Sequence, residues 1–274
     1  PEMSWGWGVK DLKYRFQWTY PILISPHDPN TLYAAGNMIF KTQNEGENWE
    51  IISPDLTKQD DTKMEASGGP ISLDTTGVEH YGTIFALAES PIIEGLFWAG
   101  TDDGLIHLSE DGGKSFRFIS WLRSQPPGFD IMPASIELEP DHIICAIRSR
   151  DSSGNRNWID LMRSNNDGLE WNYESTPVAT TGTGGNPPAM IRLSDGRICI
   201  IYGYRDAPSG IRAVLSNDNG HSWGKPIVLR NDGGNHDLGY PRVAQRTDGC
   251  LVVIYYYNDS PSEDRYIAAT IWKP

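Results

Sequence analysis

The sequence predicts an all-β fold made of five similar antiparallel sheets, and three observations support this prediction. An octet of the form S/T-x-D/N-x-G-x-x-W/F occurs four times, at 42–49, 109–116, 164–171 and 216–223. Short apolar runs stand before and after each octet, which is the pattern of strands joined by turns. The 274 residues include 28 Gly and 19 Pro, a composition that favours many turns and short elements over long helices.

The octet itself predicts a fastened hairpin turn. Its Asp or Asn side chain can accept hydrogen bonds from turn amides, and its Gly can adopt a positive φ at little steric cost. Its Trp or Phe can cover apolar surface beside the turn. The last octet shows the context, with I-R-A-V-L before it and P-I-V-L-R after it. We therefore favour a structural role for the octet over a calcium or sugar site.

The first two strands of most repeats are marked by a Pro, an apolar run and an Asp turn. Such stretches occupy 21–28, 133–141, 188–195 and 241–248. A second apolar run follows each of them: T-L-Y-A-A-G, H-I-I-C-A-I-R, R-I-C-I-I-Y-G and C-L-V-V-I-Y-Y. Residues 82–100 supply a fifth strand pair without the Pro. Successive octets start 67, 55 and 52 residues apart, and repeats of such length indicate propellers or arrays.

The end of the chain lacks one strand of the repeat. Four repeats continue through the octet into a fourth strand, read as W-E-I-I-S, F-R-F-I-S, W-N-Y-E-S and P-I-V-L-R. The fifth repeat stops at R-Y-I-A-A-T-I-W-K-P, which would leave an exposed sheet edge. Because residues 4–18 precede the first strand, we expect part of this segment to supply the missing strand.

The resulting fold prediction is a single domain, a five-bladed β-propeller of four-stranded antiparallel blades, closed by an N-terminal strand that completes the last blade. Two alternatives remain: the chain is an open fragment of a six- or seven-bladed ring, or its ring is completed by a partner chain.

Composition excludes several function classes. The formal net charge of −13 argues against nucleic acid as a partner, because phosphate binding needs a basic face. No segment approaches the ~18 apolar residues of a membrane span, and no signal peptide opens the chain at Pro1, so we expect no membrane partner and leave the compartment open. Cys145, Cys199 and Cys250 stand in apolar runs without zinc spacing, which predicts buried thiols. With no nucleotide-binding motif either, we expect no cofactor and no metal.

The octet resembles the Asp-box, or BNR repeat, of sialidases, sortilin-type propellers and related glycosidases. Residues about 13–116, with I-S-P-D-L-T and S-G-G-P-I-S-L-D-T-T-G-V-E, resemble large bacterial BNR proteins related to sortilin-type propellers. Residues about 128–274, with Y-G-Y-R-D-A-P-S-G and D-L-G-Y-P-R, resemble sialidase-like proteins. We therefore assign the blades of 1–120 and of 121–274 to two lineages. Such a chain is a chimera, made in the laboratory or by recombination.

The resemblance to sialidases implies a set of site residues. These enzymes hold the sugar carboxylate with three arginines, and they use a Tyr nucleophile helped by a Glu, with an Asp as acid and base. The catalytic residues that this pattern predicts are Tyr240, Asp237 and Asp130. The predicted ligand-binding residues are Arg150, Arg205, Arg242, His236 and Glu79. Further candidates near strand ends are Arg148, Tyr202, Tyr204, His80, Tyr81 and Glu89.

A purely structural interpretation competes with this one. In it Arg148, Arg150 and Arg205 pair with the neighbouring Asp151 and Asp206 on loops, and the tyrosines are packing residues.

One departure from the family pattern weighs against catalysis. The arginine motif F-R-I-P that opens the sialidase propeller is absent, and F-D-I-M-P stands in its place, with Asp130 where the Arg would be. We therefore expect a monomeric propeller without efficient catalysis, with at most residual binding of a carbohydrate in its central pocket. The alternative is an exo-acting, sialidase-like glycoside hydrolase. A scaffold without a ligand and a sortilin-like peptide-binding module are further alternatives.

Overall fold

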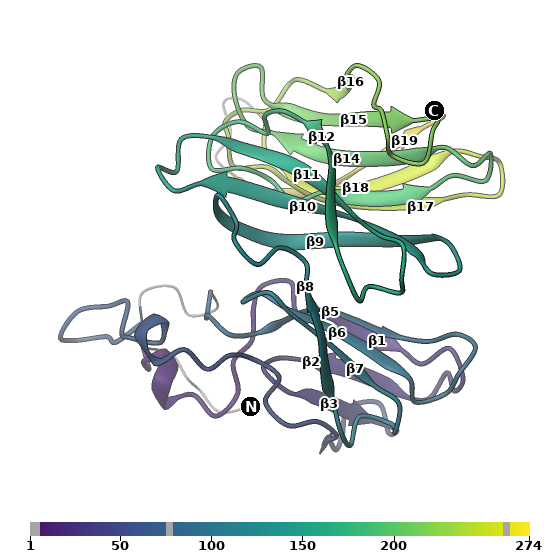
Figure 1. The fold of residues 1–274 in the computed structure, drawn as a ribbon. Helices are drawn as coiled ribbons and strands as arrows, with labels where there is room; N and C mark the ends of the chain where they lie inside the picture. Colours follow the sequence, from purple (N-terminus) through teal and green to yellow (C-terminus); the bar gives the residue numbers. More distant parts are fainter. Residues whose placement is uncertain (1–5, 75–78, 260–263) are drawn as a thin grey trace. The chain divides into compact units, whose positions relative to one another are not determined.

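The computed structural model describes residues 6–74, 79–259 and 264–274, and almost all of its regular structure is β-strand. It divides into two compact units, Pro1–Leu122 and Arg123–Pro274, here called unit 1 and unit 2 (Figure 1). The helical elements among the described residues are two short 3-10 turns, η1 (Val9–Asp11) and η2 (Asp61–Lys63). None of the helices described is long and apolar enough to cross a membrane.

Unit 1 contains two four-stranded antiparallel sheets. The strands of the first are β1 (Ile22–Ile24), β2 (Leu32–Ala35), β3 (Ile39–Thr42) and β4 (Glu50–Ile51). Those of the second are β5 (Ile84–Glu89), β6 (Phe97–Thr101), β7 (Leu105–Ser109) and β8 (Arg117–Trp121). Strand β5 lies against β1 and β2, and the core between the two sheets contains Tyr33, Ile39, Ile84 and Phe97.

Unit 2 contains three sheets. The first has β9 (Gly128–Glu139), β10 (His142–Asp151), β11 (Asn157–Ser164) and β12 (Asn172–Val178). The second has β13 (Ala189–Arg192), β14 (Ile198–Tyr204), β15 (Gly210–Ser216) and β16 (Ile227–Arg230). The third has β17 (Gly239–Gln245), β18 (Leu251–Tyr257) and β19 (Tyr266–Trp272).

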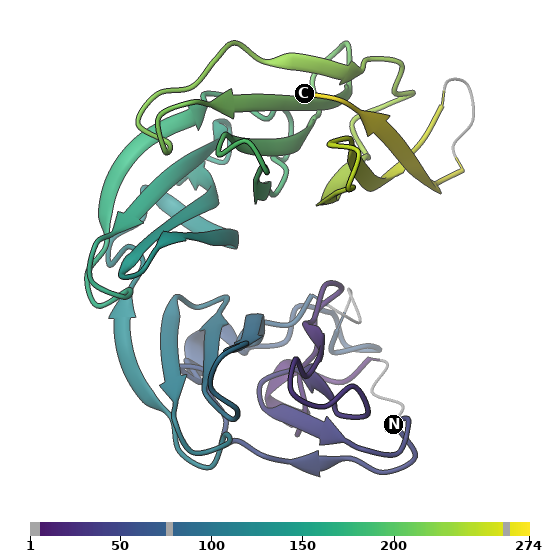
Figure 2. The ribbon, with the colours of Figure 1, turned by 90° about the vertical axis from the view of Figure 1, so that its right-hand side faces the viewer.

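Every sheet is a meander in which each strand pairs with the next along the chain (Figure 2). In unit 2 the first strands of successive sheets are neighbours, because β13 lies against β9, and β17 lies against β13 and β14. Apolar residues fill the spaces between these sheets, in one cluster around Ile159 and Ile200 and a second around Ile211 and Val253. The five sheets are therefore the five blades of a β-propeller, and this predicted fold class is confirmed.

The octet turns join the third and fourth strands of four sheets with the same hydrogen bonds. In the last octet the Ser216 hydroxyl donates to Asp218 at 2.8 Å and accepts from the Gly220 amide at 2.8 Å, while the Ser222 amide donates to Asp218 at 2.8 Å. The corresponding bonds start at Thr42, Ser109 and Ser164. The octet thus serves as the predicted hairpin fastener.

The closing strand that we expected from residues 4–18 stays a prediction. Among the described residues the last sheet has three strands, and residues 4 and 5 lie outside the described part of the chain. In residues 6–18, η1 forms a turn and Gln17 makes an isolated bridge with Glu79 in unit 1. Arg15 holds this segment in place through bonds described below.

Candidate functional site

Several polar side chains gather at one end of the unit 2 sheets. Arg148 and Arg150 lie near the end of β10, Arg205 directly follows β14, and Tyr256 lies near the end of β18. Tyr240 lies at the start of β17. In a meander the second strand of a sheet ends where the first strand begins, so these positions share one end of their sheets.

Arg205 and two tyrosines form the centre of this group. The Arg205 guanidinium donates to the Tyr256 hydroxyl at 2.7 Å and to the Leu238 carbonyl at 3.1 Å. It also lies 5.8 Å from the centre of the Tyr240 ring, and the Tyr240 and Tyr256 ring centres are 5.8 Å apart. An arginine so placed presents its remaining N–H groups beside two aromatic rings.

Arg148 adds a second, almost fully buried guanidinium. Its exposed fraction is 7%, it donates to the Gly184 carbonyl, and its Nε has no hydrogen-bond partner among the described residues. Burial lowers the pKa of Arg148, and the positive charges of Arg205 and Arg150 lower this pKa further. The interaction of Arg148 with Tyr240, by charge and by hydrogen bonding, acts in the opposite direction. Arg148, Arg205 and Tyr240 therefore act on one another directly.

None of these three arginines forms a direct ion pair with a carboxylate in the described residues, although the charge of Arg205 helps to lower the pKa of Asp237. No ion pair of Arg148, Arg150 or Arg205 occurs within the described part of unit 2. Asp151 instead accepts from the Arg156 amide and the Ser153 hydroxyl.

Asp206 likewise has other partners, since it accepts from the amide and hydroxyl of Thr183, each at 2.9 Å. The alternative that the three arginines pair with Asp151 and Asp206 is therefore wrong. Buried guanidinium groups without a carboxylate partner are suited to binding an anion.

Asn186 fixes the backbone that carries Tyr240. Its Oδ1 accepts from the amides of Gly203 at 2.9 Å and Tyr240 at 3.2 Å, and its Nδ2 donates to the Leu238 carbonyl at 3.1 Å. Tyr240 has a φ of 52°, a strained value for a residue with a side chain. A Cβ at Gly239 would lie 2.3 Å from Asn186, so only glycine fits there. Sequence reasoning missed Asn186, whose only signal is the N-P-P that precedes β13.

Asp237 joins the group as a carboxylate acceptor. Its two oxygens accept from the Tyr256 hydroxyl and from Arg265 Nε, each at 2.8 Å. Partial burial raises the pKa of Asp237, but the bonds from Tyr256 and Arg265 outweigh it and leave the pKa below its usual range. Asp237 is therefore ionised at neutral pH and has no proton to donate. His236 beside it is exposed, and its ring makes no hydrogen bond with any described residue.

Asp130 lies apart from Tyr240, on the other face of its sheet. It accepts from the Ser149 hydroxyl at 2.7 Å and forms an ion pair with Arg123 at 3.2 Å, and Arg123 also pairs with Asp160 at 2.7 Å. Successive residues of a strand point to opposite faces, so Ser149 and its partner Asp130 face away from Arg148. Burial raises the pKa of Asp130, with Ser149 and Arg123 acting against it.

The remaining unit 2 candidates are spread over the surface and the core. Arg242 is exposed on β17 and donates to the Pro241 carbonyl at 3.3 Å. Arg150 donates to the Gly154 carbonyl at 3.2 Å and is half-buried. Tyr202 is fully buried in the core cluster, which makes it a packing residue.

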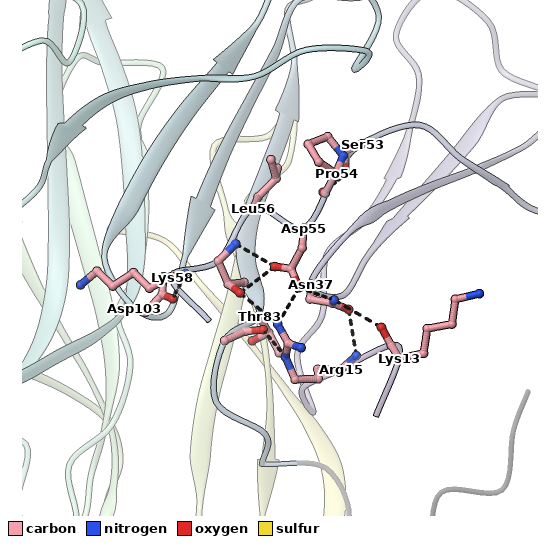
Figure 3. Close-up of polar contacts among 12 residues, drawn as sticks. Lys13, Arg15, Asn37, Ser53, Pro54, Asp55, Leu56, Lys58, Thr83 and Asp103 are labelled. Carbon is pink, nitrogen blue, oxygen red and sulfur yellow. Dashed lines mark hydrogen bonds and ion pairs between the residues drawn. The ribbon is translucent and has the colours of Figure 1, made fainter. Parts of the chain in front are cut away.

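Unit 1 contains the other candidates and a polar network that the sequence did not indicate (Figure 3). Arg15 donates to Asp55 at 2.8 Å and to the Gly82 carbonyl at 3.0 Å, and Asn37 donates to Asp55 at 2.8 Å (Figure 3). Burial raises the pKa of Asp55, but the hydrogen bonds of Asn37 and Thr57 and the charge of Arg15 lower it below its usual range. Arg15 and Asp55 pair with each other, and this ion pair holds the N-terminal segment that carries Arg15 in place.

Of the unit 1 candidates, Glu79 is exposed and bridges Gln17, whose side chain donates to the His80 carbonyl. Burial raises the pKa of the Tyr81 hydroxyl to about 12. Glu89 is buried and accepts from the Ser25 hydroxyl at 2.6 Å and the Gly95 amide at 3.0 Å.

Glu89 also lines a cleft of about 530 Å³ in unit 1. The other lining residues come from the first sheet and the residues that follow it, and from β6 and the turns of the second sheet: Tyr33, Lys41, Glu50, Ile51, Ile52, Ser53, Glu94, Gly95, Phe97, Gly112 and Lys114. Two lysines, Lys41 and Lys114, line this cleft together with the carboxylates of Glu50, Glu89 and Glu94, so its lining carries both positive and negative charge. In the described residues of either unit, no cluster of three or more His, Cys, Asp or Glu side chains is placed to hold a metal ion.

Comparison with known proteins identifies the repeat. A family model for the BNR repeat-like domain matches residues 27–253. Among solved structures, the chain is similar to a protein of unknown function from Dyadobacter fermentans, at 21% identity and a TM-score of 0.58, with 92% of this chain and 67% of that chain covered. No curated protein gives a significant match.

An endo-arabinase and an α-L-arabinanase share the fold. An endo-arabinase from Bacteroides thetaiotaomicron is 17% identical, with a TM-score of 0.50 and coverage of 99% of this chain and 98% of that chain. An α-L-arabinanase from Penicillium chrysogenum, complexed with arabinobiose, is 14% identical, with a TM-score of 0.53 and coverage of 97% and 85%. At such identities the likeness concerns the fold alone.

Proposed function

Because the chain belongs to the BNR repeat-like domain family, we propose that it is a carbohydrate-binding β-propeller whose unit 2 arginines hold the carboxylate of an acidic sugar, without efficient hydrolysis. Propellers of this fold include glycosidases with carbohydrate ligands, which supports a sugar as the ligand class. The unpaired arginines favour an acidic sugar over a neutral one.

One observation carries the proposal: Arg148, Arg150 and Arg205 form no direct ion pair with a carboxylate among the described residues, and Arg148 is buried with an unbonded Nε. A sugar carboxylate would accept from two such guanidinium groups at once, and charge-assisted bonds of this kind are the strong ones. The rings of Tyr240 and Tyr256, 5.8 Å apart, offer apolar surface for the sugar ring beside them.

Hydrolysis has less support than binding. A sialidase-like reaction needs a group that protonates the leaving oxygen. Asp237 has a lowered pKa, and Asp130 is engaged by Arg123 on the opposite face of its sheet from Arg148. An exo-acting, sialidase-like glycoside hydrolase is therefore the second candidate.

Titration calorimetry with N-acetylneuraminate and glucuronate, beside neutral methyl glycosides, tests the proposal. We expect the acids to bind and the neutral sugars to bind much more weakly. Arg205→Ala should weaken binding by about 10- to 100-fold, because a charge-assisted bond contributes about 1.5–3 kcal/mol. Arg197→Ala is the matched control, since Arg197 pairs with Asp195 at an exposed turn. Equal binding of acids and neutral sugars, or equal losses in both variants, would refute the proposal.

Hydrolysis is measured on the same protein with a fluorogenic sialoside and a panel of aryl glycosides that includes an α-L-arabinofuranoside. Turnover that disappears in Tyr240→Phe would replace the binding proposal with the exo-acting hydrolase. We expect no turnover above that of the buffer.

We also propose that the two halves have separate origins. The sequence resembles sortilin-type BNR propellers before residues 119–128 and sialidase-like proteins after them. The boundary between the two units, at Leu122 and Arg123, lies inside that stretch. Both halves are matched by one family model, so the recombined parts would be members of one repeat family. Searches with residues 1–122 and 123–274 separately should retrieve different sets of relatives. A natural gene that is closely similar across both halves would contradict a laboratory join.

A further inference from the structure

The cleft in unit 1 has the size and the wall of a small-molecule site. Its volume of about 530 Å³ lies within the range of about 300–1,000 Å³ that such sites have. The first sheet contributes a row of side chains from three strands, because Tyr33 lies opposite Lys41, and Lys41 lies opposite Glu50. Residues directly opposite each other place their side chains on one face of a sheet. A phenol, an ammonium and a carboxylate therefore stand side by side in this wall.

The second sheet contributes a buried carboxylate. Glu89 lies opposite Phe97 on the neighbouring strand, and both residues line the cleft. Glu89 is only 6% exposed, and its oxygens accept from the Ser25 hydroxyl at 2.6 Å and the Gly95 amide at 3.0 Å. Neither donor carries a charge. Because a carboxylate can accept at about four lone-pair positions, Glu89 can accept further hydrogen bonds from a ligand in the cleft.

The aromatic part of the cleft lies in a negative electrostatic field. The rings of Tyr33 and Phe97 meet edge to face, with their centres 5.0 Å apart. Burial raises the pKa of the Tyr33 hydroxyl to about 12, and the charges of Glu89 and Glu94 raise this pKa as well. A cation is therefore favoured beside the Tyr33 ring, which also offers its π face.

The other charged groups of the cleft have no partner of their own. Four of its charged side chains form neither an ion pair nor a hydrogen bond within residues 6–74, 79–259 and 264–274: Lys41, Glu50, Glu94 and Lys114. Unpaired charges of both signs in one cleft are complementary to a ligand that itself carries both signs.

We propose that this cleft binds a small zwitterion of the amino-acid class, a ligand with a primary ammonium group and a carboxylate. The ammonium group donates to Glu89, beside the Tyr33 ring. The ligand carboxylate accepts from Lys41 and Lys114. Since three carboxylates outnumber two lysines in the lining, a ligand that has only a carboxylate is disfavoured. The site does not depend on the sugar site proposed for unit 2.

Three compounds with the same six-carbon chain test the proposal. The compound 6-aminohexanoate carries both charges, hexylamine carries only the ammonium group, and hexanoate carries only the carboxylate. In calorimetric titrations of the full chain at low salt, 6-aminohexanoate should bind about 10- to 100-fold more tightly than hexylamine, because its carboxylate adds charge-assisted hydrogen bonds. Hexanoate should bind most weakly. Arg205→Ala should leave these affinities unchanged, which separates the cleft from the unit 2 arginines.

Two variants locate the ligand in the cleft. Lys114→Ala removes an exposed side chain, and should weaken binding of 6-aminohexanoate by about tenfold while leaving hexylamine unaffected. Lys225→Ala, at an exposed position of unit 2, is the matched control. Glu89→Gln keeps the shape of the side chain and should weaken both amines.

Three results would overturn the proposal, and none of them needs the buried Glu89→Gln variant to fold. The first is that none of the three compounds binds the wild-type chain. The second is equal affinity for 6-aminohexanoate and hexylamine. The third is binding of 6-aminohexanoate that is lost in Arg205→Ala and retained in Lys114→Ala, which would place the ligand at the unit 2 arginines.

Discussion

Single carboxylates in this protein have pKa values shifted in opposite directions, set by the balance between hydrogen bonds, which lower the pKa, and burial, which raises it. Asp218, in an exposed octet turn, accepts from Ser216 and Ser222, and these bonds lower its pKa to about 2. Asn44 makes the corresponding bonds in the first octet, so the turn needs an acceptor oxygen and not a charge. Asp102 is partly buried, and there the loss of solvation outweighs the bonds from Thr83 and raises its pKa to about 6.

Asp102 therefore makes folding pH-dependent in a defined direction. Its folded pKa of about 6 exceeds the ordinary value of 3.8, so the folded state binds more protons between these values, and stability falls as the pH rises through that range. Asp102→Asn stays neutral, and we expect it to flatten this fall and to stabilise the protein at pH 7.5 by about 1–3 kcal/mol.

Thermal melts from pH 4 to 7.5 measure this effect, with Asp61→Asn as a control at an exposed position of unit 1. A steeper pH dependence in Asp102→Asn than in the wild-type protein would show that the lost hydrogen bond to Thr83 matters more than burial of the charge.

At the scale of the element, the sequence predicted those features that depend on residues close together in the chain. The strands were predicted from Pro residues, apolar runs and Asp turns. Each of these signals lies within a few residues of the strand that it delimits. Arg148, Arg205 and Tyr240 were predicted as site residues because each lies at a strand end. Which face of the strand carries Asp130 could not be predicted in the same way, because a shift of one residue along a strand reverses its face.

Long-range polar partners could not be predicted in this way. The Arg15–Asp55 pair joins residues 40 apart, and no motif marks either one. Asn186 bonds to Tyr240 across 54 residues, although in sequence it is one loop Asn among many.

The glycine of the octet offers a test of the hairpin turn. Gly220 has a φ of 90°, and a Cβ there would lie 2.8 Å from the side chain of Leu161 in the core. Gly249 has a φ of 83°, with no atom within 4 Å of such a Cβ. We expect Gly249→Ala to cost about 1–2 kcal/mol from backbone strain alone, and Gly220→Ala to cost about 1–3 kcal/mol more from overpacking. Urea unfolding measures both, and equal losses would mean that Leu161 moves aside freely.

At the scale of the whole molecule, the net charge of −13 opposes any association of two copies.

The meander of every sheet has a consequence for how the protein is made. Since each strand pairs with the one before it, every blade is encoded by one continuous stretch of chain, and its pairings span short sequence separations. Short separations favour rapid folding. A nascent chain can thus complete β1–β4 while the ribosome is still translating unit 2, and translation adds the propeller one blade at a time.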